Sequence, residues 1–233
     1  MVKIEFLNVT LSYPVYGHHS MSLRSKFFQL ATGGRIHQEG QSTMITALHT
    51  ANFTIKEGDS VGLIGHNGAG KSTLLRLMAG IYPPSIGRVI LKGRIATIFD
   101  IGAGIEMELT GYENIVNLGM IMGLSNQEAL SLIPDIEVFT ELGDFLHMPV
   151  RTYSSGMIMR LMFGVSTSIS PDILLLDEMF STGDASFREK SNQRIRELIN
   201  KSKIFVFASH DESLIKNYCN RVFRLKNGVI FED

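Results

Sequence analysis

Residues 65–73 read Gly65-His66-Asn67-Gly68-Ala69-Gly70-Lys71-Ser72-Thr73 and match the phosphate-binding pattern G-x-x-x-x-G-K-[ST]. Glycines let the backbone turn tightly, so that several N–H groups can point at one anion. The pattern predicts that Lys71 reaches the β- and γ-phosphates of a nucleotide and that the Ser72 hydroxyl binds Mg²⁺. The apolar run 60–64 is typical of a buried parallel strand, and residues 73–78 open a helix with its positive end toward the phosphates.

Composition narrows the class of protein. The 233 residues are 44% hydrophobic, which is enough for one sizeable core or a core with a lobe. A net charge of −1 gives no strong field for nucleic acid, so no such partner is expected. The only cysteine, Cys219, cannot form an internal disulfide, and this fits a cytosolic setting. No stretch approaches the roughly 20 apolar residues that span a bilayer, so any membrane role is expected to come through a partner.

The order of apolar patterns predicts an α/β core with an inserted lobe. Residues 2–13 are expected to form an edge strand, and the runs 173–176 and 204–208 are typical of buried parallel strands. We expect a single domain over 1–233, with its core at about 1–103 and 170–233 and a helical lobe at about 104–169. In the insert 17–46, residues 21–30 predict a short helix that either packs on its own domain or contacts a membrane partner or lipid headgroups.

Polar residues follow two of the buried strands. Asp177 and Glu178 come directly after the run 173–176, at the carboxyl end where open α/β sheets bind ligands. We predict that Asp177 holds Mg²⁺ and that Glu178 polarises the attacking water. His210 ends the next strand, where an imidazole can hydrogen-bond the γ-phosphate. A surface acidic pair and a structural histidine are the alternatives, and the phosphate loop upstream favours the functional interpretation.

A second helix begins at residues 153–157, Tyr153-Ser154-Ser155-Gly156-Met157. Ser154 or Ser155 is a natural N-cap, so this helix offers another N-terminus to an anion. Ile158, Leu161, Met162, Val165 and Ile169 share one apolar face of it. Taken alone, this stretch predicts only a capped helix.

The order of these motifs resembles the ATPase domain of ABC transporters over essentially the whole chain. Residues 153–157 stand where that family has its signature, usually Leu-Ser-Gly-Gly-Gln. The resemblance implies a P-loop (RecA-like) core with an antiparallel β subdomain and an inserted helical lobe, with ATP and Mg²⁺ as cofactors. It also implies a head-to-tail homodimer, in which each ATP lies between the phosphate loop of one copy and the signature of the other.

The resemblance and the motifs together assign the site. Tyr13 occupies the place of the aromatic residue that stacks on adenine, and Asp184 matches the loop that crosses the dimer interface. Lys71, Glu178 and His210 are the expected catalytic residues, and Ser72, Asp177 and Asp100 the expected metal ligands. The expected nucleotide-binding residues are Tyr13, Gly65, His66, Asn67, Gly68, Ala69, Gly70, Lys71, Ser72, Thr73, Asp100 and Asp177, with Ser154, Ser155 and Gly156 from the facing copy.

Further motifs resemble the ATPase subunits of bacterial polysaccharide exporters, namely the variant signature and residues 99–104, 108–114 and 183–187. Residues 32–36 are most similar to the O-antigen branch. This implies a pair of membrane-spanning permease subunits, an undecaprenyl-pyrophosphate-linked glycan as cargo, and a peripheral place on the cytoplasmic face of the bacterial inner membrane. Capsule or teichoic-acid export is an alternative. A phosphate-loop kinase or regulatory switch fits less well, because it leaves residues 153–157 and His210 without a role. A non-transport ABC ATPase is a further, less favoured alternative.

The chain departs from the family pattern at a few places. Asp100 stands where most members have glutamine, and the crossing loop lacks the usual Ser-Ala-Leu-Asp. The chain ends at Asp233 without the carbohydrate-binding domain that some O-antigen members carry, so recognition of the glycan end by this subunit is not expected. Met107, Met120 and Met122 either belong to the core of the lobe or contact a coupling helix of the permease.

Overall fold

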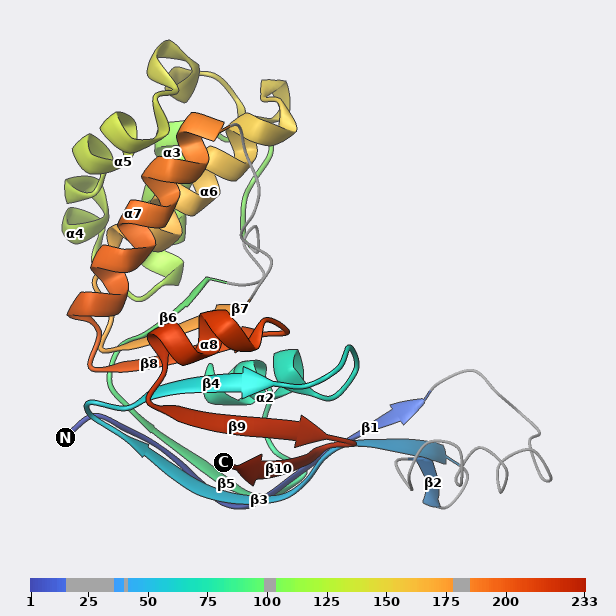
Figure 1. Ribbon diagram of the computed structural model, residues 1–233. Coiled ribbons are helices and arrows are strands. Elements are labelled where there is room, and N and C mark those ends of the chain that lie inside the picture. The colour runs from blue at the N-terminus through green and yellow to red at the C-terminus, as the bar shows by residue number, and fades with distance from the viewer. Residues whose placement is uncertain (16–35, 40–41, 99–103, 178–184) are drawn as a thin grey trace. The chain divides into compact units, whose positions relative to one another are not determined.

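The structure is a computed structural model that describes residues 1–15, 36–39, 42–98, 104–177 and 185–233. The chain divides into two compact units (Figure 1). The first unit contains Met1–Ile95, Leu175–Glu178 and Lys203–Asp233, and the second contains Ala96–Leu174 and Met179–Ser202. No helix in the described part of the chain combines the length and the apolar character that crossing a membrane requires.

An antiparallel sheet in the first unit has the strand order β2-β3-β1-β5. Its strands are β1 (Lys3–Val15), β2 (Ile36–Glu39), β3 (Ser42–Lys56) and β5 (Ile86–Lys92). Ile4 of β1 pairs with Ile55 on one side and with Leu91 on the other, so the prediction of an edge strand at residues 2–13 is wrong. The apolar alternation of β1 shows which face is buried, but it carries no information about how many neighbours the strand has.

The alternation in β1 changes phase at a β-bulge. Ile4 and Phe6 are buried, two positions apart, and so are Val9 and Leu11. Val9, however, comes three rather than two positions after Phe6. The pairing with β3 shifts register between Phe6 and Val9, and Asn8 adopts a left-handed φ of 52°. One extra residue in the strand thus keeps both apolar pairs on the same face of the sheet.

The second sheet carries the phosphate loop and has the strand order β10-β9-β4-β8-β7-β6. Strand β4 pairs in parallel with β8, as their unbroken apolar runs predicted, and it also pairs in parallel with β9. Strands β9 and β10 form a hairpin through Asn227 and Gly228, both with positive φ. The strands are β4 (Ser60–Ile64), β6 (Ile95–Ile98), β7 (Ile173–Asp177), β8 (Ile204–Ser209), β9 (Arg221–Lys226) and β10 (Val229–Glu232). Helices α2 (Lys71–Met78) and α8 (Glu212–Tyr218) pack against these strands (Figure 1).

The described part of the second unit is mainly helical, as the pattern from about residue 104 predicted. Its helices are α3 (Gly111–Ile121), α4 (Asn126–Ser131), α5 (Ile133–Thr140), α6 (Ser155–Ser168) and α7 (Ala185–Lys201), with 3₁₀ turns at Gly143–His147 and Val150–Thr152. Capping boxes at Thr110 and Ser125 start α3 and α4. Ile115, Ile136, Leu161 and Val165 are among the residues of its hydrophobic core.

The methionines of this unit differ in exposure. Met122 packs partly buried against the hydrophobic core, whereas Met107 and Met120 are each 42% exposed. Met107 and Met120 are therefore surface residues, and only Met122 fits the expectation of a core side chain.

Candidate functional site

The phosphate loop joins β4 to α2, and its glycines are required by close approach and by backbone geometry. A Cβ atom on Gly65 would lie 2.6 Å from the Leu225 carbonyl oxygen and 2.9 Å from Ala69 Cβ. Gly68 and Gly70 have φ values of 78° and 113°, which only glycine adopts without strain. Gly70 is the N-cap of α2 and provides no side-chain cap, so the first N–H groups of the helix are left for another acceptor. These features suit an anion.

Lys71 lies over this loop. Its Nζ donates to the carbonyl oxygens of Gly65, at 2.6 Å, and of His66, at 3.5 Å. His66 in turn places Nδ1 2.8 Å from the carbonyl oxygen of Asn67. The ammonium group is thus held within the loop, at the level where a phosphate oxygen would be bound by backbone N–H groups.

Ser72 and Asp177 meet at the carboxyl edge of the second sheet. The Ser72 hydroxyl donates to Asp177 Oδ2 at 2.8 Å, although the two residues lie far apart in the sequence. Among the described residues, no three His, Cys, Asp or Glu side chains form a metal cage. A hydroxyl and one carboxylate fit Mg²⁺, because this ion is usually held by one or two carboxylates together with substrate phosphates and water. The residues present therefore fit a nucleotide-dependent magnesium site.

His210 follows β8 at the same edge of the sheet. Ile64 of β4 and Ser209 of β8 are register partners, so Gly65 and His210 leave two neighbouring parallel strands at the same level. Asp211 then caps α8 by accepting from the N–H groups of Ser213, at 2.8 Å, and Leu214, at 3.4 Å. Hydrogen bonds from the Ser213 side chain and N–H hold the pKa of Asp211 below its usual range. The cap fixes the turn that presents His210.

Tyr13 lies close to the first turns of α2. Its side chain is partly buried in β1, its hydroxyl hydrogen-bonds the Thr73 side chain, and its ring meets the Tyr82 ring edge-to-face. Burial raises the pKa of Tyr13, and the Thr73 hydroxyl opposes that shift. The structure thus brings Tyr13 together with Thr73, the last residue of the phosphate-binding motif.

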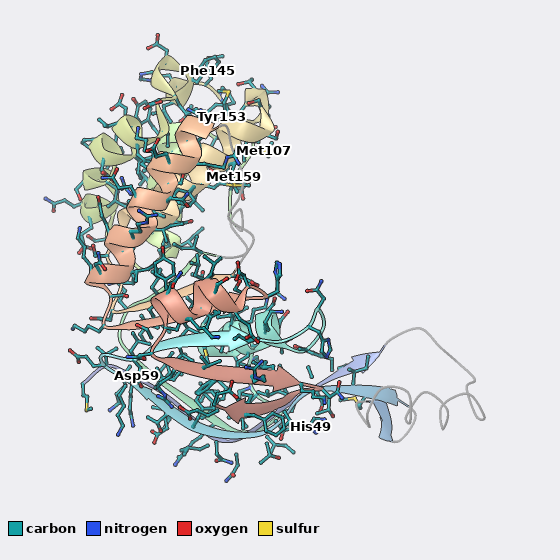
Figure 2. The ribbon with its side chains drawn as sticks, in the orientation of Figure 1. His49, Asp59, Met107, Phe145, Tyr153 and Met159 are labelled. Atoms are coloured by element: carbon teal, nitrogen blue, oxygen red, sulfur yellow. The ribbon has the colours of Figure 1, made fainter. Side chains whose placement is uncertain are left out.

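The signature residues belong to the second unit. Ser154 caps α6 and accepts from the Met157 N–H at 3.3 Å, and Ser154, Ser155 and Gly156 are all exposed. Tyr153, labelled in Figure 2 with Phe145, has a different role, because its ring is buried and its hydroxyl donates to the Phe145 carbonyl oxygen at 2.6 Å.

Two supporting residues were missed by the sequence analysis. A Cβ atom on Gly111 would lie 2.5 Å from the Tyr153 hydroxyl oxygen, so this glycine makes room for the tyrosine before the signature. Asn114 is fully buried, and its amide donates to the carbonyl oxygens of Glu106, Leu109 and Thr110 while its oxygen accepts from the Glu106 N–H. Both lie in the 108–114 motif, whose similarity to a family pointed to importance but not to this structural cause.

Three predicted residues cannot be placed. Asp100, Glu178 and Asp184 lie outside the described residues. In the first unit the structure brings Lys71, Ser72 and Asp177 together, with His210 at the same strand edge. These residues supply a cation, a helix N-terminus, a hydroxyl and a carboxylate. Such groups can bind a nucleoside triphosphate together with its metal ion.

Comparisons with known proteins identify the class. The model of the ABC transporter family matches residues 48–181. The chain is 59% identical to the O-antigen export system ATP-binding protein RfbE of Yersinia enterocolitica, over 100% of this chain and 98% of that protein. It is 39% identical to the O-antigen export system ATP-binding protein RfbB of Klebsiella pneumoniae, over 96% of this chain and 90% of the relative. The chain belongs to the ABC transporter family.

More distant matches agree on the fold. The teichoic acids export ATP-binding protein TagH of Bacillus anthracis is 38% identical over 99% of this chain, which spans 40% of that relative. The ATP-binding cassette MJ0796, solved as a dimer bound to ADP and Pi, superposes with a TM-score of 0.69 over 99% of this chain and 97% of its own, at 22% identity. The protein therefore has the ABC ATPase fold and is an ATP-binding subunit that hydrolyses ATP.

Proposed function

We propose that this chain is the ATP-hydrolysing subunit of an exporter that moves lipid-linked O-antigen across the inner membrane. The observation that carries the proposal is the 59% identity to an O-antigen export ATP-binding protein over nearly the full length of both chains. Export of teichoic acid is the second candidate, supported by the 38% identity to TagH. O-antigen export is preferred because the identity to RfbE is 59% and the identity to TagH is 38%.

In this proposal, each residue has a role in binding or hydrolysis. Lys71 and the N-terminus of α2 bind the β- and γ-phosphates, and Ser72 and Asp177, with Asp100, hold Mg²⁺. When bound, the ion neutralises charge on the phosphates. Glu178 accepts a proton from the attacking water as the water oxygen bonds to the γ-phosphorus. The bond from that phosphorus to the β–γ bridging oxygen breaks, so that ADP and phosphate are released, and His210 hydrogen-bonds the γ-phosphoryl group. Tyr13 stacks on the base.

The assembly is part of the same proposal. Residues 1–233 act as a single ATPase domain, and two copies bind ATP between the phosphate loop of one and Ser154, Ser155 and Gly156 of the other. ATP binding closes this dimer and hydrolysis releases it. The dimer works at the cytoplasmic face of the inner membrane on a pair of permease subunits, which carry an undecaprenyl-pyrophosphate-linked glycan.

Deletion of the gene in its native bacterium tests the function. We expect loss of polysaccharide from the cell surface and accumulation of the glycan on its lipid carrier inside the cell. The parent sequence should restore export, and Glu178→Gln, which retains the phosphate loop, should not. The sugar composition of the accumulated glycan distinguishes O-antigen from teichoic acid. Unchanged surface polysaccharide after deletion would reject the proposal.

Hydrolysis and dimer closure are tested with the purified chain. Glu178→Gln is expected to form a dimer with ATP and Mg²⁺, observed by light scattering during gel filtration, with no turnover. Turnover equal to that of the parent would reject the role of Glu178. A chain that stays monomeric in ATP would reject the shared site.

A further inference from the structure

A second tyrosine lies beside the one assigned to the base. The Tyr13 and Tyr82 ring centroids are 5.9 Å apart with an interplanar angle of 75°, an edge-to-face pair. Arg76 of α2 places its guanidinium carbon 5.8 Å from the centroid of the Tyr82 ring. Both tyrosines are partly buried, so part of each side chain is accessible to solvent. The function proposed above gives Tyr82 and Arg76 no role.

The loop that carries Tyr82 is fixed to α2 at one end. The N–H groups of Ile81 and Tyr82 both donate to the Arg76 carbonyl oxygen, at 2.9 and 3.3 Å. Pro83 and Pro84 follow, and their rings restrict φ in the next two residues. The backbone at Tyr82 is therefore held against the end of the helix whose first turn carries Lys71 and Ser72.

The same loop is fixed to β1 at its other end, next to Tyr13. The Ser85 N–H donates to the Thr10 carbonyl oxygen at 2.9 Å. The Ser12 N–H donates to Ser85 Oγ at 3.0 Å, and Ser85 Oγ donates to the Ser12 carbonyl oxygen at 3.2 Å. These bonds attach the loop to the residue immediately before Tyr13. Strand β1, the loop that carries Tyr82 and helix α2 are thus attached to one another, and this keeps the Tyr13 and Tyr82 rings close together.

We infer that Tyr82 is a positioning residue for Tyr13, and that it sets the affinity of the site for the nucleotide base. The edge-to-face contact restricts rotation of the Tyr13 ring about its Cβ–Cγ bond, and Arg76 over the Tyr82 ring restrains Tyr82 in turn. A ring that is already oriented loses less conformational entropy when a base stacks on it. The inference rests on the proposed binding of ATP with Tyr13 against the base.

Two ligands separate this role from a general effect on folding. ATP carries the base, and inorganic tripolyphosphate carries only the phosphates. Tyr82→Ala is expected to weaken ATP binding about threefold to tenfold, the loss of one aromatic pair, and to leave tripolyphosphate binding within about twofold. Binding is measured by isothermal titration of the full chain with Mg²⁺ present. Tyr82→Phe keeps the ring and should bind ATP as the parent does.

Two controls complete the experiment. Phe231→Ala removes an aromatic ring that is 53% exposed on β10, and it should leave both affinities unchanged. Tyr13→Ala should weaken ATP at least as much as Tyr82→Ala, and the double variant should lose no more than Tyr13→Ala alone, since Tyr82 acts through Tyr13. Full additivity would mean that Tyr82 contacts the base itself and would overturn the positioning role.

The remaining outcomes are also decisive. Equal weakening of ATP and tripolyphosphate in Tyr82→Ala would assign the residue to the shape of the phosphate loop and overturn the inference. Parent-like ATP affinity in Tyr82→Ala overturns the inference and leaves the proposed function intact. A parent chain that binds neither ligand overturns both.

Discussion

Gly62 of β4 and Ile215 of α8 lie so close that a Cβ atom on the glycine would be 2.2 Å from the isoleucine Cγ2. Ile215 is fully buried, and its Cγ2 is attached directly to Cβ, so it cannot swing away as the end of a long side chain can. A side chain at Gly62 therefore requires movement of α8. Because α8 begins at Glu212, two residues after His210, this contact connects the packing of the sheet to the position of that histidine.

Gly62→Ala is expected to lower the free energy of unfolding by about 1–3 kcal/mol, the usual cost of overpacking a core. For a chain of this length this corresponds to a fall in melting temperature of roughly 2–12 °C, measured by calorimetry. The ATPase rate at a temperature where the variant is fully folded should also fall, because the turn that carries His210 is displaced.

A double variant checks the cause. Ile215→Ala removes Cγ2 and should itself cost about 2–5 kcal/mol. If the clash is responsible, the double variant loses less stability than the sum of the two single variants, by about 0.5–3 kcal/mol. Strict additivity would contradict a clash between these two side chains.

Ser72→Ala is expected to raise the Mg²⁺ concentration that gives half-maximal ATPase activity by about tenfold or more, because one oxygen ligand is lost. In the nucleotide-free protein, the free energy of unfolding should change by no more than about 1 kcal/mol, because the exposed hydrogen bond from Ser72 to Asp177 contributes little to stability. Ser131→Ala, which removes another exposed hydroxyl, is the matched control for Mg²⁺ dependence. An unchanged Mg²⁺ requirement in Ser72→Ala would contradict the assignment of this ligand.

The meeting of the phosphate loop with Asp177 was predictable because the residues concerned follow local sequence patterns. Lys71 and Ser72 belong to one short motif, and Asp177 and His210 each follow an apolar run that predicts a parallel strand. Parallel strands align their carboxyl ends, so the strand pattern predicts that the phosphate loop after β4 and Asp177 at the end of β7 lie at one edge of the sheet. A polar or charged residue directly after a predicted parallel strand can therefore be recognised as a candidate site residue from the sequence.

The features that the sequence did not reveal depend on contacts between distant segments. The inner position of β1 arises from its pairing with β5, and the bulge at Asn8 is visible only when β3 is placed alongside. Likewise, Gly111 has to be a glycine because of the Tyr153 hydroxyl, which comes from the segment just before α6. Such constraints leave no local pattern, because the partner residue is not in the same motif.

Asn114→Leu is expected to destabilise the second unit by about 1–3 kcal/mol, because the Glu106 N–H loses its acceptor. The carbonyl oxygens of Glu106, Leu109 and Thr110 lose the amide donations but keep backbone N–H donors. Asn114→Asp is nearly isosteric but has no amide to donate, so it should also destabilise. Chemical denaturation measures both. The partly buried Asn117 one turn on offers a control in Asn117→Ala, which should change stability by much less than Asn114→Leu does. An Asn114→Asp variant as stable as the parent would show that the amide donations do not matter.

Cys219 should make the protein less stable at alkaline pH. Burial raises the pKa of its thiol to about 12, whereas an unfolded cysteine ionises near pH 8.5, so between these values the unfolded chain loses a proton that the folded chain keeps. The free energy of unfolding therefore falls as pH rises through this window. We expect the urea midpoint to drop more between pH 7.5 and pH 10 in the parent than in Cys219→Ala, where the other titrating groups are the same. Equal midpoint shifts in the two proteins would show that the thiol does not contribute.

The folded parent should also react slowly with a thiol reagent at pH 8, since thiolate is the reacting form.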